Sequence, residues 1–319
     1  MSPHQTPCKA RIWGIEPMDI FIQQSINALS LGGIYALLAL GLAVVFSIVR
    51  LINFAHGEVM TVTGYGMWFV LLLNLPVVVS IAVGIVSAIV IAVVMERVAF
   101  RQMRGADVTT LLITSFAVSQ IIQVLFQNGI SARPVAVVLP DWLTASVMLG
   151  PVRVGMASIL SIVVVCIALL ALRAILTRTV TGIAMRAASE DFAVVQLMGI
   201  SANRVIATAF AVSGALAGIA AVLWVGTRGS VDPLMGAIPV LKAFIATVVG
   251  GLGSLGGAVV GGFVLGAVEV YLQAFLPEAA LPYRDAISLS IIVAILVLKP
   301  DGLLRSLRRP LTSARRPFR

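Results

Sequence analysis

The stretch LINFAHGEVM, residues 51–60, places four residues of chemical interest between two strongly apolar runs. Asn53, His56 and Glu58 can hydrogen-bond or titrate, and Gly57 gives the backbone the freedom that a turn needs. A histidine in this setting could relay protons. Polar side chains at a helix junction can instead satisfy backbone groups that the junction leaves free. We favour a structural turn, with a proton relay at His56 as the alternative.

A second candidate is Glu269, which lies deep in the apolar run GGFVLGAVEVYLQAFL. If this run spans a membrane, an ionised group there costs roughly 2.5–3.5 kcal/mol on insertion scales and is by default a functional-site hypothesis. Two other interpretations stay open. Glu269 could be a protonated or hydrogen-bonded packing residue inside a helix bundle, or it could lie at a shallow position near the interface.

Glycines crowd the stretch GGLGSLGGAVVGG, residues 250–262, and three of them match the G-x-G-x-x-G pattern of dinucleotide sites. That pattern needs a strand before it and a helix after it, whereas the flanks here are apolar enough for a membrane. We therefore favour a tight break between two short helices that pack closely through small residues. The residues assigned to this break and its packing are Gly250, Gly251, Gly253, Gly256 and Gly257.

The loop RAASEDFAVVQLMGISANRV, residues 186–205, combines charge with apolar residues. Glu190 and Asp191 favour the N-terminus of a short helix. The apolar surface that we expect on this helix consists of Phe192, Val195, Leu197 and Met198. Such a surface either meets another protein or lies in the lipid interface, and the residues alone leave both open.

The elements that must position these residues are membrane helices. The chain has 319 residues, 60% hydrophobic and only 11% charged, with a mean hydropathy of +1.09. Soluble domains carry about 45–50% apolar and about 25% charged residues. We expect an all-α polytopic membrane protein with about eight or nine transmembrane helices, some short or interrupted by glycine. The expected spans are approximately 20–48, 59–74, 76–95, 108–127, 154–175, 205–227, 237–251, 254–276 and 285–298.

The net charge of +9 does not indicate a nucleic-acid partner, because the basic residues lie in short loops and in the tail 299–319. This is the positive-inside pattern, which also favours anionic lipid. Loops 95–107 and 173–204 and the C-terminus are therefore expected in the cytoplasm. Residues 51–58 are expected on the same side. Three less basic loops, 128–153, 228–236 and 277–285, are expected outside, together with the N-terminus. The two cysteines show no disulfide or metal spacing.

The expected organisation has three parts. Residues 1–17 form an N-terminal extension or an artefact of start-site choice, which N-terminal sequencing of the native protein tests. Residues 18–304 form a transmembrane permease domain, and residues 305–319 form a basic cytoplasmic tail.

Three segments resemble the LivH-type permease of bacterial branched-chain amino-acid ABC importers. They are GGIYALLALGLAVVFSIVRLINFAHGEVM (32–60), GIAMRAASEDFAVVQLMGISANRV (182–205) and LKAFIATVVGGLGSLGGAVVGGFVLGAVE (241–269). The resemblance implies an inner-membrane, non-enzymatic subunit with no cofactor of its own. It also implies a LivM-type second permease, two cytoplasmic ATPases that bind ATP, and a periplasmic substrate-binding protein.

The resemblance also gives roles to the segments above. The expected ATPase-coupling loop consists of Glu190, Asp191, Phe192, Ala193, Val194, Val195, Gln196, Leu197, Met198 and Gly199. In ABC importers this loop often has the pattern E-A-A-x-x-x-G. This chain keeps the glycine as Gly199, but Ala193 stands in place of the glutamate, and Val194 and Val195 stand in place of the two alanines. INFAHGE looks like the family signature. We expect a conformational junction there, with substrate contact as the alternative.

Other functions stay open at this stage. The same kind of machine could carry urea, short amides, other amino acids or organic acids. A stand-alone secondary transporter would use Glu269, Lys242 or His56 as ion-coupling groups, and a passive channel comes third. Whether the assembly holds one copy of this chain with a paralogue, or two copies, is not readable from the sequence.

Overall fold

The computed structural model describes residues 17–149 and 152–298. In chain order its elements are α1 (Pro17–Val49), α2 (His56–Leu72), α3 (Val77–Met95), η1 (Glu96–Phe100), α4 (Val108–Gly129), β1 (Val135–Ala136), α5 (Asp141–Thr144), β2 (Ser146–Leu149), β3 (Val152–Gly155), α6 (Met156–Arg178), α7 (Val180–Glu190), α8 (Phe192–Leu197), α9 (Ala202–Arg228), β4 (Ser230–Val231), α10 (Ala237–Gly250), α11 (Leu255–Phe275), η2 (Glu278–Tyr283) and α12 (Arg284–Leu298). Apart from Pro17, the predicted N-terminal extension lies outside the described residues, as do the basic tail and the C-terminus.

The prediction of an all-α polytopic membrane protein is confirmed. Each of the nine expected spans is a helix in the described part of the chain, and seven helical segments there are long and apolar enough to cross a membrane. The exceptions are α2, with 17 residues, and α10, with 14. Both fall short of the roughly 20 residues that a straight crossing needs.

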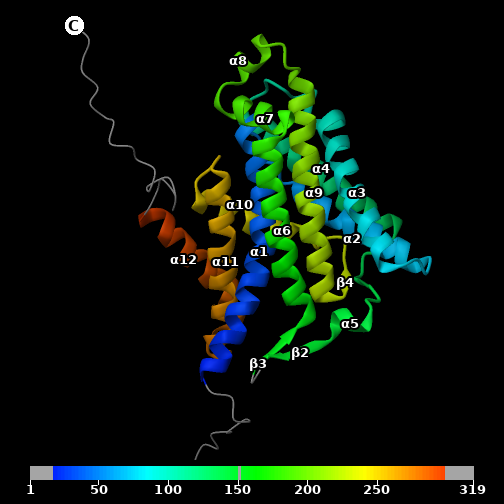
Figure 1. Cartoon of the computed structure of the whole chain (residues 1–319), viewed down its shortest axis with the longest axis vertical. Helices are drawn as coiled ribbons and strands as arrows, with labels where there is room; N and C mark the ends of the chain where they lie inside the picture. The colour runs from blue at the N-terminus through cyan, green and yellow to red at the C-terminus, as the bar shows by residue number, and fades with distance from the viewer. Residues whose placement is uncertain (1–16, 150–151, 299–319) are drawn as a thin grey trace, which may run out of the picture.

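The long helix α1 forms the centre of the bundle, and α6, α9, α10 and α11 pack around it (Figure 1). The most extensive packing joins α1 to α11. A Cβ atom added to Gly266 would lie 2.3 Å from the Gly32 Cα, and one added to Gly262 would lie 2.4 Å from the Ala36 Cα. Because no side chain fits in these gaps, small residues let the two helix backbones approach.

The two short helices begin inside the bundle and meet there. A Cβ atom on Gly57 would lie 2.5 Å from the Gly236 carbonyl oxygen, and one on Gly236 would lie 1.9 Å from the Gly57 oxygen. Gly57 is in the first turn of α2, and Gly236 directly precedes α10. The segments 50–55 and 229–236 therefore lead the chain back into the bundle before each short helix starts. Irregular backbone at membrane depth is tolerated where protein buries it.

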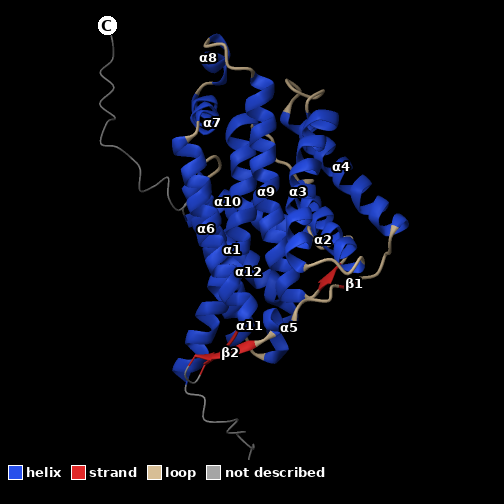
Figure 2. Ribbon diagram, turned by 45° about the vertical axis from the view of Figure 1, so that its right-hand side comes forward, coloured by secondary structure: helices blue, strands red, loops and turns tan. Residues whose placement is uncertain are grey.

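The connections gather at two opposite ends of the bundle (Figures 1 and 2). One end carries α7 and α8. The other carries α5 and two small antiparallel sheets, in which Val135 pairs with Val231 and Ser146 with Gly155. Helix α11 finishes beside the start of α1, where the rings of Phe21 and Tyr271 stack 5.6 Å apart. We name these the α8 end and the β2–β3 end.

Candidate functional site

The NFAHGE segment forms a buried polar cluster around the start of α2. Glu58 has no exposed surface, and its Oε1 accepts hydrogen bonds from the Ser119 hydroxyl at 2.9 Å and from Gln123 Nε2 at 2.7 Å. His56 is 2% exposed, and its Nδ1 lies 3.2 Å from the hydroxyl of Ser213. Ser119 lies near the middle of α4, and Ser213 lies near the middle of α9. The side chains of His56 and Glu58 are thus in the interior of the bundle, deeper than a position at its rim.

The backbone of this segment finds side-chain partners, as expected for a helix junction. The Phe54 N–H donates to the Ser115 hydroxyl at 3.3 Å, and that hydroxyl can also donate to the Ile52 carbonyl at 3.3 Å. The partner comes from α4 rather than from Asn53 itself. Gly41 of α1 makes room for the imidazole, because a Cβ atom there would lie 2.8 Å from His56 Nε2.

Several polar atoms of this cluster are buried without a hydrogen-bond partner among the described residues. They include Asn53 Oδ1, His56 Nε2, Glu58 Oε2 and the Tyr65 hydroxyl. A buried polar atom with no partner costs roughly 1–3 kcal/mol. The cluster is therefore a region that another arrangement of the helices, or a solute, could satisfy better.

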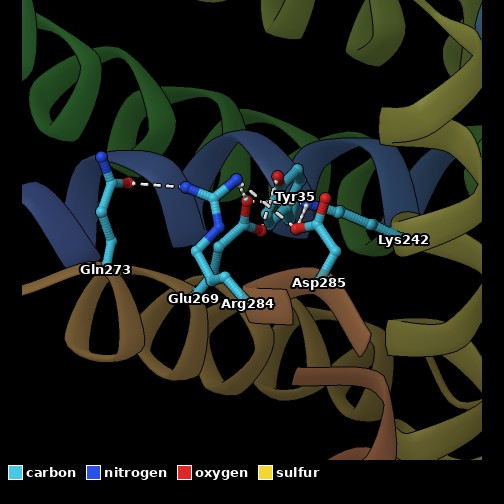
Figure 3. Close-up of polar contacts among 6 residues, drawn as sticks. All are labelled: Tyr35, Lys242, Glu269, Gln273, Arg284 and Asp285. Carbon is cyan, nitrogen blue, oxygen red and sulfur yellow. Dashed lines mark hydrogen bonds and ion pairs between the residues drawn. The ribbon is translucent and has the colours of Figure 1, made fainter. Parts of the chain in front are cut away.

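Glu269 is the hub of a second polar cluster, which joins α1, α10, α11 and α12 (Figure 3). One carboxylate oxygen lies 2.7 Å from Lys242 Nζ and 3.8 Å from Arg284 Nη2, while the other accepts from the Tyr35 hydroxyl at 2.9 Å. Asp285 completes the cluster at 3.4 Å from both basic groups. Glu269 is 6% exposed, so its side chain is buried within the bundle.

Two acidic and two basic residues balance the charge of this cluster, which fits the cost of isolated charges in a membrane. Of its members the sequence singled out Glu269, and Lys242 only as an alternative ion-coupling group. The sequence did offer a clue to this ion pair, because Lys242 and Glu269 each lie inside an apolar run, where a charge needs a partner. Nothing local in the sequence indicated Tyr35 as a partner. Glu269 and Lys242, two of the candidate ion-coupling groups, form an ion pair with each other in this structure.

The glycine-rich break joins α10 to α11, with no strand between them. Gly251 and Gly253 have positive φ angles of 101° and 84°, which glycine adopts easily. The Ser254 hydroxyl then accepts a hydrogen bond from the Gly257 N–H at 3.1 Å and caps α11. A Cβ atom on Gly250 would lie 2.0 Å from the Gly257 oxygen. Gly256 lies in the first turn of α11. The stretch has the geometry of a tight helix hairpin and lacks the strand of a dinucleotide site.

The segment 190–199 begins with Glu190, the last residue of α7, and contains the short helix α8 at the tip of one end of the bundle (Figure 1). The Asp191 carboxylate accepts from the Val194 N–H at 3.1 Å, and Gly199 ends the segment with a φ of 79°. Its solvent-facing apolar side chains are Val194, Leu197 and Met198, which are 49%, 88% and 74% exposed.

The predicted surface of this helix was wrong in one respect. Val195 is only 3% exposed and packs inward, and Phe192 is half-buried. Residues three and four apart share a helix face, so Val194 presents the same face as Leu197 and Met198. Of the other positions in the segment, Glu190 and Gln196 are exposed.

A further contact near α8 was missed at the sequence level. Arg104 forms an ion pair with Glu96 and donates a hydrogen bond to the Asn203 side chain. Glu96 is 2% exposed and opens the π-helical turn η1, while Asn203 lies in the first turn of α9. The sequence marked Arg104 only as a loop charge. The contact ties the start of α9, which follows α8, to the end of α3.

The chain is similar in sequence to known transport permeases. The family described as "Branched-chain amino acid transport system / permease component" matches residues 25–296. The permease protein LivH of Salmonella typhimurium is 34% identical over 89% of this chain and 95% of its own length. BraD of Pseudomonas aeruginosa is 31% identical over the same shares. Among solved structures, PsaBC from Streptococcus pneumoniae in complex with Fab covers 88% of this chain and 94% of its own, with 14% identity and a TM-score of 0.47.

The helical bundle and its spans define a multi-pass membrane protein. The chain belongs to the family of permease components of branched-chain amino-acid transport systems.

Proposed function

We propose that this chain is the membrane-spanning permease subunit of an ABC importer for branched-chain amino acids in the bacterial inner membrane. The similarity to LivH and BraD, whose names give that transport system, carries the proposal. In it, ATP is bound by two cytoplasmic ATPase subunits and substrate is delivered by a periplasmic binding protein. A LivM-type permease forms the other half of the pathway. This chain has no catalytic residue and no cofactor in this scheme.

The α8 end then faces the cytoplasm, as the loop charges predict. The apolar face of Val194, Leu197 and Met198 is too exposed for a free surface in water and has the character of a docking site. In the proposed importer an ATPase docks on this face, which makes α8 the coupling helix. ATP binding and hydrolysis would favour one arrangement of the bundle over another, because the ATPase binds the two arrangements with different affinity.

Two connections link α8 to the helices of the bundle and would transmit its movement. Helix α8 is followed directly by α9, whose middle holds Ser213 against His56. The Arg104 contact links the same helix start to α3 through Glu96. The first of these contacts reaches the NFAHGE cluster at His56, which supports that cluster as the junction at which the bundle changes conformation.

The test is mild purification of the chain from its native membrane, followed by mass spectrometry of the proteins that accompany it. The proposal expects two kinds of partner, an ATPase and a second, related permease. A bound periplasmic protein is then titrated with leucine, isoleucine and valine, with urea and short amides as competitors. Recovery of the chain as a lone oligomer that transports without ATP contradicts the proposal.

A further inference from the structure

A cavity of about 460 Å³ opens at the β2–β3 end of the bundle, where α1, α6, α9 and α11 diverge. This volume is within the roughly 300–1,000 Å³ of typical small-molecule sites. Ser30, Ile34 and Val270 form its buried floor. Thr227 and Gln273 are exposed at its rim and lie in the last turns of α9 and α11. The cavity is therefore open to the outside of the bundle and extends inward along α1.

The lining of this cavity is polar but uncharged. Among the described residues that line it, none is ionisable, and six carry amide or hydroxyl groups. Polar side chains in membrane helices face either the bundle interior or a water-filled pathway. A solute with net charge would lose its hydration here and find no counter-charge, which is unfavourable. The lining suits a small solute with no net charge.

The hydrogen bonds of the lining leave both donors and acceptors free for a ligand. Arginine has only donors, so the group of Gln273 that faces Arg284 Nη1 at 3.0 Å must be its oxygen, and the amide nitrogen stays available. Asn27 Nδ2 donates a hydrogen bond to Gln24 Oε1 at 3.3 Å. The amide nitrogen of Gln24 and the amide oxygen of Asn27 therefore stay available for a ligand. A zwitterion needs N–H donors for its carboxylate and oxygen acceptors for its ammonium group.

The lining also contains the aliphatic residues Leu31, Ile34 and Val270, which continue the helix faces of these amides along α1 and α11. We infer that this cavity is an outer substrate site for a free amino acid with an aliphatic side chain. Its carboxylate and ammonium groups bond to the amides, and its side chain packs on the aliphatic residues. This inference rests on the proposed function, because that function places the β2–β3 end outside and supplies the amino acid there.

Binding is tested directly by cysteine protection in the purified assembly. Ser30→Cys is nearly isosteric and places a thiol on the cavity floor, in a background that carries Cys166→Ser and Cys8→Ser. A small water-soluble thiol reagent should label this variant, and leucine should slow the labelling by about tenfold at saturation. Leu29→Cys, one position away and outside the cavity lining, is the matched control, and leucine should leave its labelling unchanged. Absence of labelling at Ser30→Cys, or labelling that leucine does not slow, overturns the inference. Protection by urea but not by leucine also overturns it.

Transport gives a second readout in proteoliposomes that hold the complete importer. Gln24→Leu should lower leucine uptake at saturating loaded binding protein by about tenfold, the loss expected for one hydrogen bond to a charged group. Gln23→Leu is the matched control, because Gln23 is adjacent on α1 but does not line the cavity. Equal uptake rates for the two variants overturn the inference. Failure of the unmodified assembly to take up leucine instead contradicts the proposed function, and cysteine protection then still decides whether the cavity binds leucine.

Discussion

Lys242 Nζ lies 2.7 Å from Glu269 Oε1, and this ion pair joins α10 to α11 inside the bundle. Each residue would be costly if its charge were buried without a partner. Together they hold the short helix α10, which begins at the contact with α2, against the longer α11. The pair thus fixes one side of the junction at which the two short helices meet.

Breaking this pair from one side should destabilise the protein strongly. Glu269→Leu leaves Lys242 buried without its main partner, and removal of one member of a buried pair typically costs about 3–5 kcal/mol. The double variant Lys242→Met/Glu269→Leu should recover much of this loss, since it leaves neither charge behind. Thermal unfolding of the unmodified protein, Lys242→Met, Glu269→Leu and the double variant in detergent measures the coupling. Additive losses in the double variant would show that the two residues act independently.

The contact between Gly57 and Gly236 should tolerate no side chain. An alanine at position 57 would place its Cβ atom 2.5 Å from the Gly236 oxygen, so the two helix starts must separate. Overpacking of this kind costs about 1–3 kcal/mol. We expect Gly57→Ala to lower both thermal stability and transport. Gly129→Ala is the control, because nothing lies within 4 Å of a Cβ atom there. Equal behaviour of the two variants would refute the close contact.

A charge on the apolar face of α8 should weaken ATPase binding without affecting the fold. Leu197 is 88% exposed, so Leu197→Asp removes no packing within this chain. If the side chain is an anchor in the ATPase interface, its loss costs at least about 2 kcal/mol of binding, which is roughly 30-fold in affinity. Gln196→Asp, on the same short helix, is the matched control. Co-purification and binding measurements with the ATPase compare the two, and an unimpaired Leu197→Asp complex would exclude this face as the docking surface.

The Arg104 contact gives a prediction for the α3–α9 connection. Arg104→Met leaves Glu96 buried without its cation, which should lower the unfolding temperature. In the proposed importer it should also reduce transport more than ATP hydrolysis, because the start of α9 loses its tie to α3. Arg101→Met, in the same loop, tests for a general effect of charge. If Arg104→Met and Arg101→Met lower transport and ATP hydrolysis to the same extent, the Arg104 contact does not specifically link α9 to α3.

The sequence was enough to predict the helical membrane fold, because composition and apolar run length depend on the bilayer and not on tertiary contacts. It also placed the ends of α10 and α11 well, since Gly251 and Gly253 permit a turn that other residues do not. The meeting of Gly57 and Gly236 was not predictable, as it joins positions far apart in the chain.

Side-chain partners were the least predictable feature. Tyr35 reads as an ordinary residue of an apolar helix, and only the packing of α1 against α11 brings its hydroxyl to Glu269. The inward orientation of Val195 was missed for a related reason. A six-residue helix such as α8 has too few turns for its apolar pattern to specify which face packs.

The most direct test of the account measures uptake of labelled leucine by proteoliposomes that contain the purified assembly, with ATP inside and the binding protein outside. The account predicts uptake that requires both ATP and the binding protein and continues when the proton gradient is collapsed. Uptake by this chain alone, without ATP, that stops when the gradient collapses would contradict it and identify the protein as a secondary transporter.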